Sequence, residues 1–321
     1  MIHRFLPAAA LAALCATPLA AETWQMSAHD PDGNFHTENI RQFAADVAEK
    51  SGGALTLDVK SNAVLLSRAD LKRGVQRGVV PIGEVLISAL ANENPIFAAD
   101  SVPILATDFD EARRLWEASK PVYEKTLADE GLKILWAEPW PPQGIYTKDP
   151  IESAADLKGV KFRAYNPTTA RFAELMGAVP ATVASGEIGQ AFSTGVISGM
   201  LTSPTTGVDS QAWDFVKHYY DVKAFIPKNF VLVNSRAFDA LPPEAQTALT
   251  EAAAAAETRG WQMAQEATDK ATATLTENGM EVHAPPQALA DDLKSVGDTM
   301  VEEWIQSGGE DVRAIVEAYR K

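Results

Sequence analysis

The chain has 321 residues, a single cysteine and a formal net charge of −15 at pH 7. Such an acidic surface repels nucleic acid and anionic lipid, which excludes partners that are recognised through their phosphates. It also repels small anions at long range, so any anion-binding site needs donors that are placed locally.

The first 21 residues have the pattern of a secretory signal. Arg4 gives a basic start, a short apolar run follows, and small residues end at Ala21. The apolar run is too short to span a bilayer, and a buried N-terminal helix is the alternative. We therefore expect a periplasmic protein without membrane insertion. Cys15 lies in this segment, so we expect no disulfide and no thiolate chemistry in the mature chain.

Strands and helices alternate along the rest of the chain, which is typical of a parallel or mixed sheet covered by helices. Hydrophobic periodicity and end signals predict, in chain order, a strand near Thr23, a helix over about 36–50, a strand over 54–60, a helix over 68–78, a strand over 79–88, a helix over 108–131 and a strand over 132–138. After the proline-rich stretch 139–144 they predict a strand around Arg163, a helix over about 168–177, a strand over 178–182, a helix over 186–195 and strands over 197–203 and 229–234.

Residues 243–278 predict one long helix, because proline begins the segment, Asn278-Gly279 ends it and helix formers fill it. Such a helix is about 50 Å long, whereas a lobe of half the mature chain is only about 30–35 Å across. Gly260 in its middle fits either a bend or a tolerant surface position. We therefore expect two α/β lobes that share hinge strands and this helix. The expected boundaries are 22–142 plus about 229–268 for the first lobe, and 143–228 plus about 269–321 for the second.

No sequence motif of a catalytic, metal or cofactor site is present. The five histidines, at positions 3, 29, 36, 218 and 283, do not pair at helical or zinc-ligand spacing. Glycine-rich nucleotide loops and a serine nucleophile motif are also missing. We therefore predict no catalytic residue, no metal ligand and no cofactor.

Arg163 lies in the stretch LKGVKFRAYNP, residues 157–167, where a strand is expected. Phe162 and Ala164 alternate with Arg163, so the guanidinium projects from the face opposite to these apolar side chains. A guanidinium on a central strand either forms an ion pair with a distant glutamate or faces a cleft, because burying an unpaired charge is costly. In the second case, its planar fork matches the carboxylate of a ligand.

The same stretch resembles extracytoplasmic solute-binding proteins of tripartite ATP-independent periplasmic (TRAP) transporters, the DctP-like family. Three further stretches resemble the family in the same order: FAADVAEKSGGALTLDV, GEIGQAFSTGVISGMLTSP and FVLVNSRAFDALPPEAQTAL. The resemblance covers nearly all of the mature chain. It implies the bilobal periplasmic-binding-protein fold, and it assigns to Arg163 the binding of the substrate carboxylate.

The resemblance also implies further ligand-binding positions. Where the family often has an asparagine that touches ligand, this chain has Thr202 followed by Ser203, and Gln143 stands at a hinge position that is sometimes arginine. One cation among neutral donors favours a monocarboxylate. Further candidates are Trp140, Tyr165 and Phe35, which would suit an aromatic, benzoate-like acid. Glu84 would face the ligand or pair with Arg163. The last candidates are Trp213 and Asn229.

We therefore expect a binding protein that captures a small organic acid by hinge closure and delivers it to a TRAP membrane permease. One alternative is a periplasmic hydrolase or isomerase on the same scaffold, with Glu84 or Glu187 as the base. Another is a protein that delivers its ligand to a sensor. The sequence does not separate sensing from transport.

Overall fold

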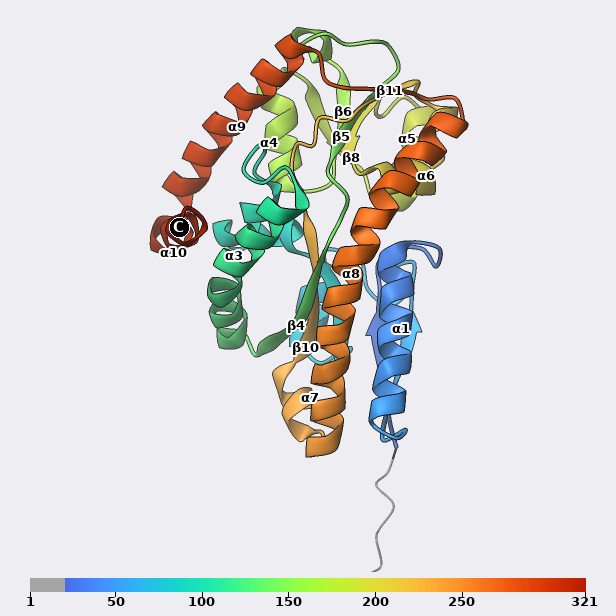
Figure 1. The fold of residues 1–321 in the computed structure, drawn as a ribbon, viewed down its shortest axis with the longest axis vertical. Helices are drawn as coiled ribbons and strands as arrows, with labels where there is room; N and C mark the ends of the chain where they lie inside the picture. The colour runs from blue at the N-terminus through green and yellow to red at the C-terminus, as the bar shows by residue number, and fades with distance from the viewer. Residues whose placement is uncertain (1–20) are drawn as a thin grey trace, which may run out of the picture.

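The computed structural model describes residues 21–321, so the predicted secretory signal lies outside the described residues apart from its last position, Ala21. Two β-sheets, each covered by helices, lie one above the other along the long axis of the molecule (Figure 1). We call each sheet with its covering helices a lobe. None of the helices in the described range has the length and apolar character needed to cross a membrane.

The first sheet has the strand order β2-β1-β3-β10-β4. β10 runs antiparallel to both neighbours, whereas β1 pairs in parallel with β2 and β3. All residues of β3 and β10 are buried, as expected for central strands covered on both faces. The five strands are β1 (Glu22–Ser27), β2 (Leu55–Lys60), β3 (Ile82–Leu86), β4 (Leu132–Pro139) and β10 (Lys228–Asn234).

The second sheet has the order β11-β9-β5-β8-β6-β7, in which β5 is antiparallel to both of its neighbours. The remaining pairs are parallel. Both sheets are therefore mixed, as the sequence predicts. The six strands are β5 (Gly144–Thr147), β6 (Lys161–Ala164), β7 (Val179–Thr182), β8 (Gly199–Thr202), β9 (His218–Tyr220) and β11 (Glu281–His283).

Several helices begin where a side chain caps the first turn. Asn34 accepts a hydrogen bond from the backbone of His36, and Asp108 accepts one from Glu111. The first lobe contains α1 (Phe35–Lys50), α2 (Leu71–Gln76), α3 (Phe109–Asp129), α7 (Ser235–Ala240) and the 3₁₀ segments η1 (Ile87–Leu90) and η2 (Pro95–Ser101). The second contains α4 (Pro167–Leu175), α5 (Ile188–Ser193), α6 (Pro204–Asp209), η3 (Ala154–Leu157), η4 (Ser185–Glu187) and η5 (Ala212–Asp214).

Helix α8 (Pro243–Glu277) has 35 residues and is therefore about 50 Å long. It packs against α1 and β4 in the first lobe and against α6 and β11 in the second, so it runs along both lobes as predicted (Figure 1). Gly260 is buried in its middle, where a Cβ atom would overlap Glu138 and approach Asn39 Nδ2 within 2.8 Å. The glycine therefore permits close packing, and a tolerant surface position does not explain it.

Of the C-terminal helices, α9 (Gln287–Ser307) contacts both lobes and α10 (Gly309–Tyr319) contacts the first. α10 packs on α3, and the indole of Trp304 donates to Pro95 O in the first lobe at 2.7 Å. Arg171 on α4 forms an ion pair with Glu303, which ties α9 to the second lobe. We propose that the lobe boundaries expected from the sequence hold up to residue 268. Beyond that residue, we propose that α9 bridges the two lobes and that α10 belongs to the first lobe.

Two chain segments cross side by side between the lobes. One leads from β4 to β5 and the other from β9 to β10, and backbone hydrogen bonds join Trp140 N to Pro227 O and Gln143 N to Phe225 O at 2.8 and 3.0 Å. This paired crossing holds Trp140 and Gln143 in fixed positions between the two sheets.

Candidate ligand-binding site

A small cavity lies between the lobes. Several of its residues stand at or just beyond the carboxyl ends of strands: Leu86 of β3, Arg163 of β6 and Thr202 of β8. Ligands of open α/β sheets bind at such ends. The lining residues are Arg68, Leu86, Trp140, Gln143, Arg163, Tyr165, Ser185, Thr202, Ser203, Thr206 and Pro227.

Arg163 is the most buried charge of this cavity, with 1% of its surface exposed. Its Nε donates to Val183 O at 3.0 Å and its Nη2 donates weakly to Ser185 Oγ at 3.3 Å. Among the described residues, its Nη1 has no hydrogen-bond partner. The guanidinium is therefore held at one edge and has free donor capacity at the other.

No carboxylate of residues 21–321 forms an ion pair with Arg163, so the internal ion pair considered from the sequence is wrong. Burial lowers the pKa of Arg163 to about 10, and the positive charge of Arg68 acts in the same direction. The group remains a cation at neutral pH. A buried cation without an acid is costly, so we propose it as a binding group for an anion.

The local sequence explains this placement. In β6, Phe162 and Ala164 face the apolar core while Arg163 projects from the opposite face, as the alternation predicts. β6 lies between β7 and β8, so the strand is held by a neighbouring strand on each side. Tyr165 follows, and its ring lies 5.3 Å from the guanidinium carbon.

Neutral polar groups surround the cation. The hydroxyl of Tyr165 donates to Gln143 Oε1 at 3.0 Å, and Gln143 Nε2 donates to Pro141 O at 2.9 Å, so the amide is oriented from both ends. Ser203 caps α6 by accepting from Thr206 N at 3.1 Å, and its hydroxyl also contacts Thr206 Oγ1 at 3.0 Å. Thr202 precedes it at the end of β8 and is 3% exposed.

Trp140 forms an aromatic wall whose orientation is fixed. Its indole Nε1 donates to Asn229 Oδ1 at 3.0 Å, and Asn229 Nδ2 in turn donates to Glu84 Oε1 at 2.8 Å. Phe35 contacts the ring edge-on at 5.7 Å between centroids. Asn229, Glu84 and Phe35 therefore support Trp140 from behind and do not line the cavity themselves.

The sequence-predicted residues fall into two groups. Six of them line the cavity: Arg163, Gln143, Thr202, Ser203, Tyr165 and Trp140. Glu84, Phe35, Asn229 and Trp213 do not, and Trp213 packs in an apolar cluster of the second lobe.

Glu84 does not pair with Arg163, because it belongs to a separate buried network. His36 Nδ1 lies 3.2 Å from Glu84 Oε1 and 3.0 Å from Glu138 Oε1, and all three side chains are fully buried. Burial alone would lower the pKa of His36, but the charges and hydrogen bonds of both glutamates outweigh it and raise the pKa to about 10. His36 is therefore a cation at neutral pH, and it neutralises the acid that the sequence offered as a partner for Arg163.

Arg68 is a second cation at the cavity, and reasoning from the sequence missed it. It lies just before α2 in the predicted amphipathic segment 68–78, where a charged side chain is expected on the solvent face. Its Nη2 is 3.7 Å from Asp30 Oδ1, and a fifth of its side chain is exposed. Burial raises the pKa of Asp30 to about 6 despite the opposing effect of Arg68. The other missed lining residues carry no signal in their local sequence.

Direct hydrogen bonds join the lobes beside the cavity. Asn34 Nδ2 in the first lobe donates to Asp209 Oδ2 of α6 at 2.8 Å. Asn166, the cap of α4, donates to Ser88 Oγ at 2.8 Å. The lobes are therefore in contact around the cavity, as in a closed arrangement.

Two α/β lobes that share a hinge and enclose a polar cavity with a buried cation define a bilobal periplasmic-binding-protein fold. The chain belongs to the DctP family, because the family model described as bacterial extracellular solute-binding protein, family 7, matches residues 26–307. The resemblance to TRAP receptors is thereby confirmed. The family is periplasmic and consists of solute-binding receptors that work with TRAP membrane permeases, which excludes the hydrolase or isomerase alternative.

Similar solved structures agree with this assignment. DctP7 of Bordetella pertussis, an extracytoplasmic solute receptor described as binding pyroglutamic acid, is 53% identical, and the match covers 94% of this chain and 100% of that chain with a TM-score of 0.93. A pyroglutamate-specific TRAP protein of an unidentified marine microbe is 37% identical, covering 94% and 99% with a TM-score of 0.91. The uncharacterized protein YiiZ of Salmonella typhimurium is 25% identical over 62% of either chain.

Proposed function

We propose that this chain is a receptor for pyroglutamate, a small monocarboxylate whose ring is a neutral lactam. One observation carries the proposal: a buried, acid-free guanidinium with an unpartnered Nη1 faces a cavity whose other polar groups are neutral apart from Arg68, in a chain 53% identical to a receptor described as binding pyroglutamic acid. Arg163 binds the carboxylate through its fork.

The neutral groups opposite favour a lactam over the aromatic acid expected from the sequence. A lactam offers one carbonyl acceptor and one N–H donor, which suit the amide of Gln143 and the hydroxyls of Thr202 and Ser203. A benzoate ring offers neither, so it could not use the remaining hydrogen-bonding capacity of these groups. Sites made to hydrogen-bond a ligand reject analogues that lack the bonding groups. Trp140 then acts as an apolar wall against one face of the ring.

Ligand capture proceeds by closure of the two lobes. Arg163 belongs to the second lobe and Arg68 to the first, so a ligand that touches both sides stabilises the closed arrangement. The contacts of Asn34 with Asp209 and of Asn166 with Ser88 support this step. We expect the radius of gyration measured by X-ray scattering to decrease when pyroglutamate binds. An unchanged radius at saturation would contradict closure.

Isothermal titration calorimetry with the unfolded and refolded protein tests the ligand, because refolding removes molecules that copurify. We expect saturable 1:1 binding of pyroglutamate with a dissociation constant in the micromolar range or below. A micromolar constant corresponds to a binding free energy of about −8 kcal/mol. Proline shares the five-membered ring but lacks the lactam carbonyl, succinate carries a second charge, and benzoate is flat and apolar. Tighter binding of any of these three than of pyroglutamate would overturn the assignment.

We also propose export through residues 1–21 and delivery of the ligand to a TRAP permease. The family relationship supports both steps. Mass spectrometry of the protein recovered from a periplasmic fraction tests the first, since cleavage after Ala21 leaves Glu22 as the N-terminal residue. Recovery of the uncleaved chain would contradict it.

A further inference from the structure

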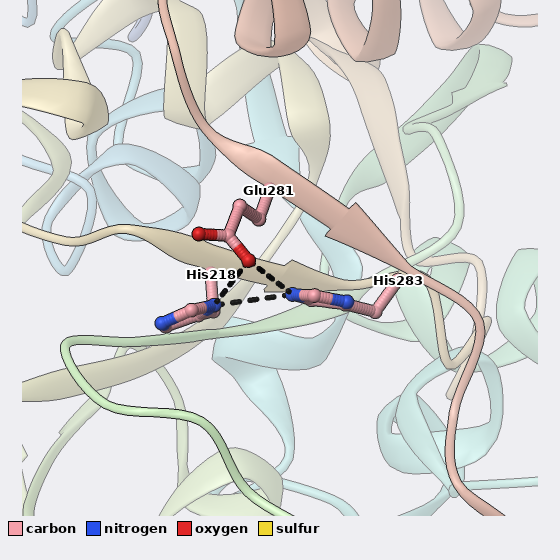
Figure 2. A group of neighbouring side chains, drawn as sticks. All are labelled: His218, Glu281 and His283. Atoms are coloured by element: carbon pink, nitrogen blue, oxygen red, sulfur yellow. Dashed lines mark hydrogen bonds and ion pairs between the residues drawn. The ribbon is translucent and has the colours of Figure 1, made fainter.

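Three side chains of the kind that bind metal ions meet at one edge of the second sheet. His218 lies on β9, and Glu281 and His283 lie on β11, the edge strand (Figure 2). None of the three lines the cavity between the lobes. The sequence predicts no metal site, because these residues are far apart or at strand spacing along the chain. Strand pairing brings them together.

The pairing of the two strands explains why all three point the same way. β9 and β11 are parallel, with His218 opposite Glu281 and Tyr220 opposite His283. Alternate residues of a strand project from the same face, so Glu281 and His283 share a face with His218. Between them, Tyr219 and Val282 belong to the apolar cluster on the other face.

The donor atoms are spaced as the ligands of one metal ion. His218 Nδ1 and His283 Nε2 are 3.1 Å apart, and Glu281 Oε2 lies 3.6 and 3.8 Å from them. A point about 2 Å from all three atoms lies inside this triangle, which matches the length of Zn–N and Zn–O bonds. Glu281 is largely exposed, so water can reach the site and occupy further coordination positions.

The surrounding structure holds the donors in place. The ring of Tyr220 stacks on His283 with 4.8 Å between centroids, and the Tyr220 hydroxyl accepts a hydrogen bond from Ile151 N at 2.8 Å. The backbone of Glu281 donates to Lys217 O at 2.8 Å. These contacts restrain the ring of His283 and the backbone of Glu281.

We propose that His218, Glu281 and His283 form a binding site for a divalent transition-metal ion, with Zn²⁺ as the best match to two imidazoles and one carboxylate. β11 connects the end of α8 to the sheet, so a bound ion ties this edge strand to β9 and stabilises the second lobe. The site is separate from ligand capture and does not depend on the proposed ligand.

Titration of the untagged protein with ZnCl₂ after EDTA treatment tests the site, since a histidine tag would itself bind zinc. We expect saturable binding of one equivalent by calorimetry and an unfolding midpoint that rises with zinc concentration. Ca²⁺ and Mg²⁺ should have no such effect, because they prefer all-oxygen ligands. The absence of saturable zinc binding would overturn the proposal and leave an ordinary hydrogen bond between the two imidazoles as the explanation of the short contact.

Substitutions locate the site. His283→Ala and Glu281→Gln should each weaken zinc binding by roughly 10-fold or more. Glu49→Gln, which removes an exposed carboxylate of α1, is the matched control and should bind zinc like the wild type. The unfolding midpoint in EDTA shows that each variant is folded. If the folded His283→Ala variant binds zinc as tightly as the control, the metal lies elsewhere and the proposal is refuted.

Discussion

Replacement of Arg163 by alanine is the most direct test of the ligand-binding site. The guanidinium is 1% exposed, has no acidic partner and presents an Nη1 without a hydrogen bond. In the complex we expect Nη1 and Nη2 to donate two parallel hydrogen bonds to the ligand carboxylate. Alanine removes both bonds and leaves the carboxylate buried opposite Arg68 alone.

The size of the loss follows from these contacts. A hydrogen bond to a charged group contributes about 1.5–3 kcal/mol, and one of the two replaces a weak contact to Ser185 at 3.3 Å. Truncating one partner of a buried charge pair costs about 2–5 kcal/mol. We therefore expect the dissociation constant for pyroglutamate to rise by roughly 30-fold to several thousandfold. Arg163→Lys keeps the charge but not the fork, so we expect a smaller loss of about tenfold.

Calorimetry on the refolded variants measures this change, and chemical denaturation shows whether they are folded. Lys161→Ala is the matched control, because Lys161 is an exposed cation of the same strand, outside the cavity. Arg163 forms no internal ion pair, so the unfolding free energy of the ligand-free Arg163→Ala protein should stay within about 1 kcal/mol of wild type. If that variant is folded and binds pyroglutamate within threefold of wild type, Arg163 does not bind the carboxylate.

Three further changes test the neighbouring parts of the structure. Arg68→Gln should weaken pyroglutamate binding by only about tenfold in calorimetry, because Arg68 is partly exposed and lies 3.7 Å from Asp30. A loss of affinity equal to that of Arg163→Ala would contradict the smaller role of Arg68. Gly260→Ala should lower the unfolding free energy by about 1–3 kcal/mol in urea, because its Cβ would overlap Glu138. The raised pKa of His36, from 6.5 to about 10, adds stability that is complete below about pH 6.5 and is lost as the pH rises through 10. The unfolding free energy should therefore fall more steeply between pH 7 and 10 in wild type than in His36→Gln, and equal slopes would refute the ion network.

Much of the fold could be predicted from the sequence, because the hydrophobic periodicity of a long segment indicates which of its side chains are buried. The helix predicted over 108–131 is found at Phe109–Asp129, and the one over 243–278 at Pro243–Glu277. The elements that were not predicted, such as β9, β11 and α6, have only 3–6 residues. Periodicity needs more residues than these segments have, and tertiary pairing defines them instead.

The candidate site could be predicted where a residue conflicts with its local pattern. Arg163 interrupts an apolar strand, and Trp140 and Gln143 lie in a proline-rich crossing. Each of the three can therefore be identified as a candidate from the sequence. Arg68 does not, because a charged residue beside an amphipathic helix looks like an ordinary surface residue. His218 and His283 are 65 positions apart, and only the parallel pairing of β9 and β11 brings them within 3.1 Å of each other.

The separation of the acids from Arg163 is what keeps the site available for an anion. The chain carries an excess of carboxylates, and any of them within reach would neutralise the guanidinium and compete with the ligand. Glu84 and Glu138 are instead held by the cationic His36 behind Trp140, and Asp30 lies next to Arg68. The buried network therefore supports Trp140 and also withholds its two acids from the cavity. This arrangement leaves a cation whose strongest available partner is a carboxylate from outside the protein.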